Sequence, residues 1–117
     1  MPIKNAMASV AVKDVKAATE WYSRVLDRQA KRPMPEVAEF HFEGGGALQV
    51  YQLSERAGAG SCTLAVTNID EQADALRRLG IDNAETISGS AAKVLMIKDP
   101  DGNSIAFAEA IDPDLAE

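Results

Sequence analysis

The stretch Ser9-Val10-Ala11-Val12-Lys13-Asp14-Val15 has the alternation of a β-strand and runs directly into Lys16–Leu26, where apolar residues recur at helical spacing. Fifty-four residues further along, Thr63–Ile69 shows a similar alternation and runs into a second helical pattern over Asp70–Leu79. A pattern that returns at a long interval indicates a repeated structural unit. The sequence therefore predicts two copies of a strand followed by a helix.

The ends of the predicted helices carry residues suited to helix termini. Asp14 and Asn68 each precede a helix, and either side-chain oxygen can accept a hydrogen bond from a free backbone N–H of the first turn. Gly80 follows the second helix and can adopt the left-handed conformation that ends many helices. These signals support the same strand–helix boundary in both copies.

A β-hairpin pattern follows each helix. In both halves, two alternating segments flank a loop of residues that favour tight turns. The segments and loops are Val37–Glu43, Gly44–Gly46 and Ala47–Tyr51 in the first half, and Lys93–Lys98, Asp99–Asn103 and Ser104–Ala108 in the second. Each half therefore reads as a strand, a helix and two or three antiparallel strands.

This arrangement predicts a single α+β domain over residues 1–117, built from two βαβββ modules. Module one spans about residues 3–57 and module two about residues 61–110. Ser54–Ser61, which contains Gly58 and Gly60, is expected to be a flexible link, and residues 111–117 an acidic tail. A chain of 117 residues can bury a hydrophobic core without disulfides or metal.

The order of these elements carries a family resemblance. Together with the Trp21-Tyr22-x-x-Val25-Leu26 pattern in the first helix and the Asp99-Pro100-Asp101-Gly102-Asn103 loop before the last strand, it resembles the vicinal oxygen chelate superfamily. That superfamily includes glyoxalase I, extradiol dioxygenases, fosfomycin resistance enzymes and bleomycin resistance proteins. The resemblance covers roughly residues 3–110 and implies that the two modules form a half-barrel cup.

The metal site of the superfamily is not matched by this sequence. Metalloenzymes of the superfamily usually place a His or Glu ligand on each of four strands, and these positions fall here on Met7, Gln49, Ser61 and Ala106. Divalent metals bind oxygen and imidazole donors, and only Gln49 offers a side-chain carbonyl. The resemblance therefore implies no inherited metal and no cofactor; a divalent metal would fit only if the alignment were displaced.

Strand parity predicts the residues that line the cup. If Phe40 and Phe42 face the helix, pairing across the glycine loop places His41 opposite Gln49 and Glu39 opposite Tyr51. The predicted ligand site comprises Met7, Ser9, Glu39, His41, Gln49, Tyr51, Ser61, Thr63, Met96 and Ala106. One wall is polar and the other, with Ala65, Val94 and Ala108, is small and apolar. Such a cup suits an amphipathic organic ligand.

Several of these residues also fit purely structural roles. His41 is the only histidine and a candidate general base, but it also fits a partly solvated strand position, as do the glutamates beside it. Trp21 and Tyr22 fit core packing better than ligand stacking. Cys62, the only cysteine, is expected to be a buried and inert thiol.

Composition excludes several classes of protein. Twelve basic against eighteen acidic side chains give a net charge of −6, which disfavours binding to nucleic acid. A lone cysteine excludes intrachain disulfides and multi-cysteine metal sites. No apolar run approaches the ~18 residues of a membrane span, and the N-terminus lacks the apolar stretch of a signal peptide. The expectation is a soluble, cytoplasmic protein.

Two functions remain open at this point. The resemblance to bleomycin resistance proteins implies a non-catalytic protein that holds a small organic ligand between modules without a metal. The alternative is a lyase, isomerase or dioxygenase of the glyoxalase type, similar to lactoylglutathione lyase, with displaced metal ligands or a metal-free mechanism based on His41. Open sheet edges and apolar surface on the cup predict a homodimer. Bleomycin resistance proteins commonly pair module one of one subunit with module two of the other, but the sequence leaves open whether this chain does so.

Overall fold

The computed structural model describes residues 2–81, 84–89 and 92–110. Within these residues there are two helices, a short 3₁₀ helix and eight strands, and each module has the predicted order of strand, helix and antiparallel strands. They are β1 (Met7–Val12), α1 (Val15–Leu26), β2 (Lys31–Met34), β3 (Val37–His41), β4 (Ala47–Gln52), η1 (Ser54–Arg56), β5 (Ser61–Ala65), α2 (Ile69–Arg78), β6 (Glu85–Ser88), β7 (Ala92–Lys98) and β8 (Ser104–Ala110).

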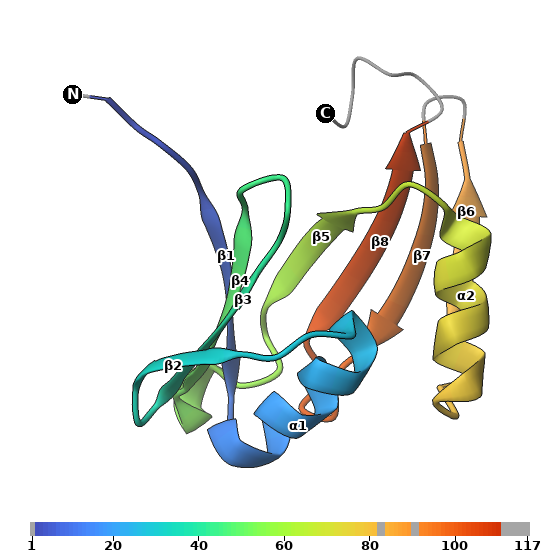
Figure 1. The fold of residues 1–117 in the computed structure, drawn as a ribbon. Coiled ribbons are helices and arrows are strands. Elements are labelled where there is room, and N and C mark those ends of the chain that lie inside the picture. Colours follow the sequence, from blue (N-terminus) through green and yellow to red (C-terminus); the bar gives the residue numbers. More distant parts are fainter. Residues whose placement is uncertain (1, 82–83, 90–91, 111–117) are drawn as a thin grey trace.

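The strands form two sheets of four, with the orders β1-β4-β3-β2 and β5-β8-β7-β6. In each sheet the first strand pairs in parallel with the last, and the other pairs are antiparallel. Helix α1 contacts β3 and β4, whereas α2 contacts β7 and β8. The predicted α+β fold of two βαβββ modules is confirmed (Figure 1).

The helix ends confirm the sequence signals. Asp14 and Asn68 each accept two hydrogen bonds from backbone N–H groups of the following first turn, at 3.0–3.3 Å. An N-cap of this kind contributes about 1 kcal/mol to helix stability. Gly80 has the expected left-handed φ of 82°, and Asp27, which the sequence had not indicated, ends α1 with a φ of 52°.

Strand parity is also confirmed, because alternate side chains face the helices. In β8, Ile105 and Phe107 are buried while Ala106 between them is only half-buried. Tyr22 is fully buried and Trp21 packs edge-on against it, as expected for core residues. The other buried side chains on the predicted helix-facing side are Phe40, Leu48, Val50, Leu95 and Ile97.

The link between the modules is anchored rather than a free linker, which corrects the prediction. Its first residues form η1, and its Gly60 N–H donates a hydrogen bond to Asn103 Oδ1 at 2.9 Å. Gly58 has a φ of 88°, and a Cβ there would lie 2.3 Å from the backbone oxygen of Asp101. Two glycines that indicated flexibility instead permit close packing against the loop between β7 and β8.

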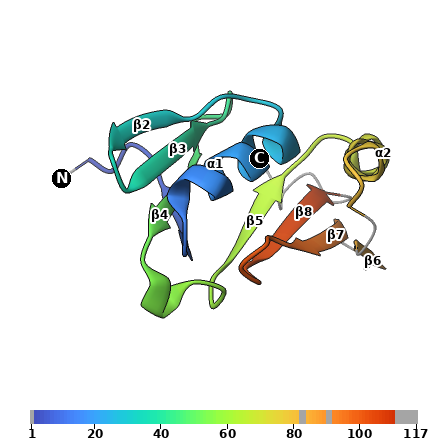
Figure 2. The same cartoon turned by 90° about the horizontal axis from the view of Figure 1, so that it is seen from below.

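The two sheets meet at an angle, and both helices lie on its inner side (Figure 2). Helix α1 lies between the two sheets in both views, and β1 of the first sheet contacts β5 of the second. The buried side chains of both modules form one continuous core. The face of each sheet that carries no helix is therefore on the outer side of the angle. None of the described helices is long and apolar enough to cross a membrane.

Candidate ligand site

The helix-free face of the first sheet holds all six predicted site residues of module one. Backbone pairing arranges this face in three rows across β3, β4 and β1. The rows are His41–Ala47–Met7, Glu39–Gln49–Ser9 and Val37–Tyr51–Ala11. The strands thus bring together residues that lie up to 44 positions apart in sequence, from Met7 to Tyr51.

The pairing across the glycine loop differs from the prediction by two residues. The residue opposite Gln49 is Glu39 and not the predicted His41. The residue opposite Tyr51 is Val37 and not the predicted Glu39. The reason is the position of the turn, because the Phe42 N–H bonds to the Gly46 carbonyl and the turn takes Glu43 as its first residue. A slip of two residues leaves every side chain on its predicted face.

A hydrogen-bonded chain of side chains crosses the middle of this face. Ser9 Oγ donates to Gln49 Oε1 at 3.4 Å, and Gln49 Nε2 donates to Glu39 Oε2 at 3.3 Å. His41 Nε2 lies 3.2 Å from the other carboxylate oxygen of Glu39. The Glu39 side chain is 16% exposed and that of His41 is 43% exposed. The carboxylate of Glu39 is therefore held in place while the imidazole stays accessible.

The helix-free face of the second sheet is polar at the end that carries Lys98 and mainly apolar beyond it. Its rows across β7, β8 and β5 are Lys98–Ser104–Ser61, Met96–Ala106–Thr63 and Val94–Ala108–Ala65. Ile87 of β6 pairs with Val94 and is 53% exposed, which makes it one of the most exposed large apolar residues described. The side chains that β5 and β8 place on this face, from Ser61 and Ser104 to Ala65 and Ala108, are small.

Within one chain, the helix-free faces of the two sheets do not face each other. Both lie on the outer side of the angle between the sheets, because the helices occupy the inner side (Figure 2). These two faces therefore do not enclose a cup within one copy of the chain, which differs from the half-barrel cup that the resemblance implied. The physical reason is the way α1 packs between the sheets, which no local pattern specifies.

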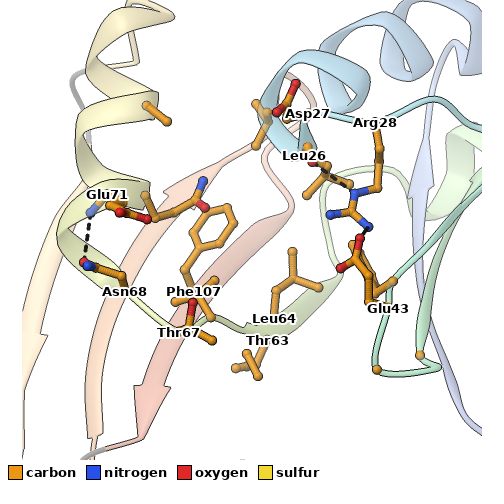
Figure 3. A pocket seen from close by; sticks show the side chains of 18 of the residues that line it. Leu26, Asp27, Arg28, Glu43, Thr63, Leu64, Thr67, Asn68, Glu71 and Phe107 are labelled. Carbon is orange, nitrogen blue, oxygen red and sulfur yellow. Dashed lines mark hydrogen bonds and ion pairs between the residues drawn. The ribbon is translucent and has the colours of Figure 1, made fainter.

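The inner side of the angle contains a different concavity, an open groove of about 1150 Å³ (Figure 3). Leu64 and Phe107 point into it from the second sheet, between α2 and the end of α1. At its rim, Arg28 is already bonded to the carbonyls of Leu26 and His41 and pairs with Glu43 at 3.5 Å. The sequence did not indicate this groove, because it forms between modules.

The four positions at which the resemblance implies metal ligands do not carry residues that suit a metal. Met7 and Gln49 belong to the first sheet, and Ser61 and Ala106 belong to the second. A thioether, an amide, a hydroxyl and a methyl group are a poor donor set for a divalent ion. The described residues also contain no cluster of three or more His, Cys, Asp or Glu side chains.

Cys62 is buried in the core, as predicted. Burial, with a further contribution from the charge of Asp99, raises the pKa of its thiol to about 11. The thiol is therefore protonated at neutral pH and is a poor nucleophile. Neither Cys62 nor the buried Tyr22 lies on either helix-free face.

Two βαβββ modules, each with a strand order in which the first strand pairs with the last, define a protein of the glyoxalase and bleomycin resistance class. Residues 7–108 match the glyoxalase-like domain family, and the chain belongs to that family. The family lies within the vicinal oxygen chelate superfamily, as the resemblance implied.

Solved structures share this fold over nearly the whole chain. A glyoxalase/bleomycin resistance protein from Catenulispora acidiphila is 31% identical, with a TM-score of 0.80, and the match covers 90% of this chain and 96% of that one. TnmS3, an antibiotic binding protein from Streptomyces sp. CB03234, is 18% identical with a TM-score of 0.77, over 94% and 98% of the two chains. Lactoylglutathione lyase from Agrobacterium tumefaciens is 20% identical with a TM-score of 0.76, over 93% and 95%. Among curated proteins, no sequence matches the chain.

Proposed function

We propose that this protein binds an amphipathic organic small molecule without a metal, in a cup that two copies of the chain build together. The observation that carries the proposal is the pairing of one polar and one apolar helix-free face in the same chain. The row of hydrogen-bonded side chains formed by Ser9, Gln49, Glu39 and His41 offers polar groups that can fix the orientation of a ligand. The small side chains of β5 and β8 offer apolar area that supplies affinity.

A second copy follows from the geometry of the faces. Each chain presents its polar wall and its apolar wall on outer surfaces that point away from each other (Figure 2). A two-fold arrangement can place the polar face of one copy opposite the apolar face of the other, and symmetry then creates two equal cups. The exposed side chains of Met7 and Ile87 would be covered in the same step.

The family supports a binding role as well as an enzymatic one. TnmS3, which shares the fold, is an antibiotic binding protein, and the Catenulispora structure is a glyoxalase/bleomycin resistance protein. The donor set at Met7, Gln49, Ser61 and Ala106 favours the binding role, since it cannot hold the metal on which other members depend. The direct test is a thermal-shift screen of amphipathic antibiotics against the purified protein.

The first prediction is a homodimer. Sedimentation equilibrium at micromolar concentration should give twice the mass of one chain, because two helix-free faces with exposed apolar side chains are costly to leave in water. A variant with Ile87 replaced by lysine should shift the equilibrium toward the monomer, whereas Glu20→Lys, on an exposed turn of α1, should not. A wild-type monomer over the whole micromolar range would contradict the proposal.

The second prediction is that the purified protein carries little metal. Elemental analysis after dialysis should give well below one Zn, Ni, Fe or Mn per chain, for the chemical reason given above. Ala106→Glu combined with Met7→His and Ser61→His would restore the usual donor types, and this triple variant should retain metal if the alignment is right. Stoichiometric metal in the wild type would overturn the metal-free mechanism.

One observation favours a second candidate function. His41 Nε2 and Glu39 Oε1 lie 3.2 Å apart, and an imidazole oriented by a carboxylate is an arrangement used for general base catalysis. Lactoylglutathione lyase from Agrobacterium tumefaciens has the same fold. Assays for that lyase activity with wild type and His41→Gln would separate the two: turnover that depends on His41 supports the enzyme, and saturable binding without turnover supports the binding protein.

A further inference from the structure

The loop between β7 and β8 buries two polar side chains. Asp99 is 5% exposed and Asn103 is 0% exposed, although connecting loops normally lie on the surface. The Asp99 carboxylate accepts hydrogen bonds from the N–H groups of Asp101 and Asn103, at 3.0 and 2.8 Å, and from Asn103 Nδ2 at 2.8 Å. These bonds shape the loop within module two.

Other contacts of the loop reach across to module one. The Tyr22 hydroxyl of α1 donates to Asp99 Oδ2 at 2.7 Å, and Asn103 Nδ2 donates to the Ala11 carbonyl of β1 at 2.8 Å. The Lys13 N–H donates to Asp101 Oδ2 at 3.3 Å. Burial and the bond to Asp99 raise the pKa of Tyr22, so its hydroxyl remains a donor.

The same loop also fixes the segment that joins the modules. Asn103 Oδ1 accepts a hydrogen bond from Gly60, and Ser104 donates its N–H to the Gly60 carbonyl at 2.9 Å. Among the described residues, no buried side-chain polar atom of this region lacks a partner. A buried polar network is stabilising only when every member is satisfied. This one is satisfied in the orientation that the two modules have in the structure.

We infer that Tyr22, Asp99 and Asn103 form an inter-module clasp that sets the angle between the two sheets. The clasp does not touch the ligand; it positions the polar and apolar faces so that a second copy can complete both cups. The completion of the cups by a second copy rests on the proposed function, whereas the clasp itself lies within one chain. The three side chains are therefore positioning residues.

The clasp is tested by removing one hydroxyl group. Tyr22→Phe keeps the aromatic ring in the core but removes the donor to Asp99. Thr19→Val is the matched control, because the Thr19 hydroxyl on the same helix donates to the Val15 carbonyl at 2.6 Å, a bond that stays within module one. Asp101→Ala is a second variant: it removes the 3.3 Å hydrogen bond from Lys13, another contact between the loop and module one, and leaves the core untouched.

Residual dipolar couplings report the relative orientation of the modules. In wild type and in Thr19→Val, one alignment tensor should fit the amides of both modules, whereas Tyr22→Phe should require two tensors or a reduced order in one module. Exchange protection at the amides of Gly60 and Asn103 should fall by at least about tenfold, since a hydrogen bond to a charged group is lost. Amides inside each sheet should keep their protection.

The outcomes separate a clasp from general stabilisation. A uniform loss of protection over both sheets with a single tensor would show that Tyr22 only supports the core, and would overturn the inference. Unchanged couplings and exchange in both Tyr22→Phe and Asp101→Ala would overturn it as well. If the clasp loosens while the wild type proves to be monomeric, the clasp stands and the proposed function fails.

Discussion

Replacing Ala106 by leucine is expected to abolish ligand binding while leaving the fold largely intact. Ala106 is half-buried at the centre of the apolar face, between Thr63 of β5 and Met96 of β7. A leucine there adds volume where the ligand is proposed to lie, and the cost to the fold is at most about 1–3 kcal/mol of overpacking. Compounds that raise the Tm of the wild type should leave the Tm of Ala106→Leu unchanged.

Tyr51→Phe provides a milder contrast on the opposite wall. It removes one hydroxyl from the polar face, so affinity should weaken by only about 1 kcal/mol. Loss of binding in Ala106→Leu with a small change in Tyr51→Phe places the ligand against both helix-free faces. If both variants bind like the wild type, the ligand lies elsewhere, and Leu64→Trp would test the groove on the inner side of the angle. A strong loss of stability in Ala106→Leu would mean that the face is packed.

Replacing Gly58 by alanine is expected to lower the stability of the fold more than Ala106→Leu does. The added Cβ would lie 2.3 Å from the backbone oxygen of Asp101, so the link and the β7–β8 loop must move apart. Overpacking of about 1–3 kcal/mol and the cost of a left-handed alanine, about 1 kcal/mol, both add to the effect. Denaturant unfolding should show a decrease of about 3 kcal/mol in the free energy of unfolding.

Gly80→Ala is the matched control for this variant. Gly80 has a φ of 82°, close to the 88° of Gly58, but a Cβ there meets no atom within 4 Å. The control therefore carries the conformational cost alone, about 1 kcal/mol. Equal losses in the two variants would show that the link does not pack closely against the loop.

The sequence alone was sufficient to predict the two modules and the side of each strand that faces a helix. The alternation around Ile105 and Phe107 identified the buried side of β8, and the capping residues Asp14 and Asn68 set the start of both helices. These features depend on interactions within a few residues, so the local pattern carries the information. The grouping of the polar residues on one face followed from strand parity in the same way.

The register across the glycine loop was the first feature that the sequence could not set. Three consecutive glycines allow the turn to begin at Glu43 or at Gly44, and both choices keep the same side chains on the same face. Only the backbone bonds between Phe42 and Gly46 decide between them. As a result, Glu39 rather than His41 lies beside Gln49, which places the carboxylate at the centre of the polar chain.

Local patterns determined what each wall of the site is made of, and tertiary contacts decided where the walls point. The angle between the sheets depends on Tyr22 bonding to Asp99, 77 residues away, and on Asn103 bonding to Ala11, 92 residues away. The sequence of a turn motif such as Asp99–Asn103 predicts the hairpin, but it does not predict the distant residues to which the turn forms hydrogen bonds. Those partners meet only when both modules are packed, because buried polar groups then have no water to satisfy them.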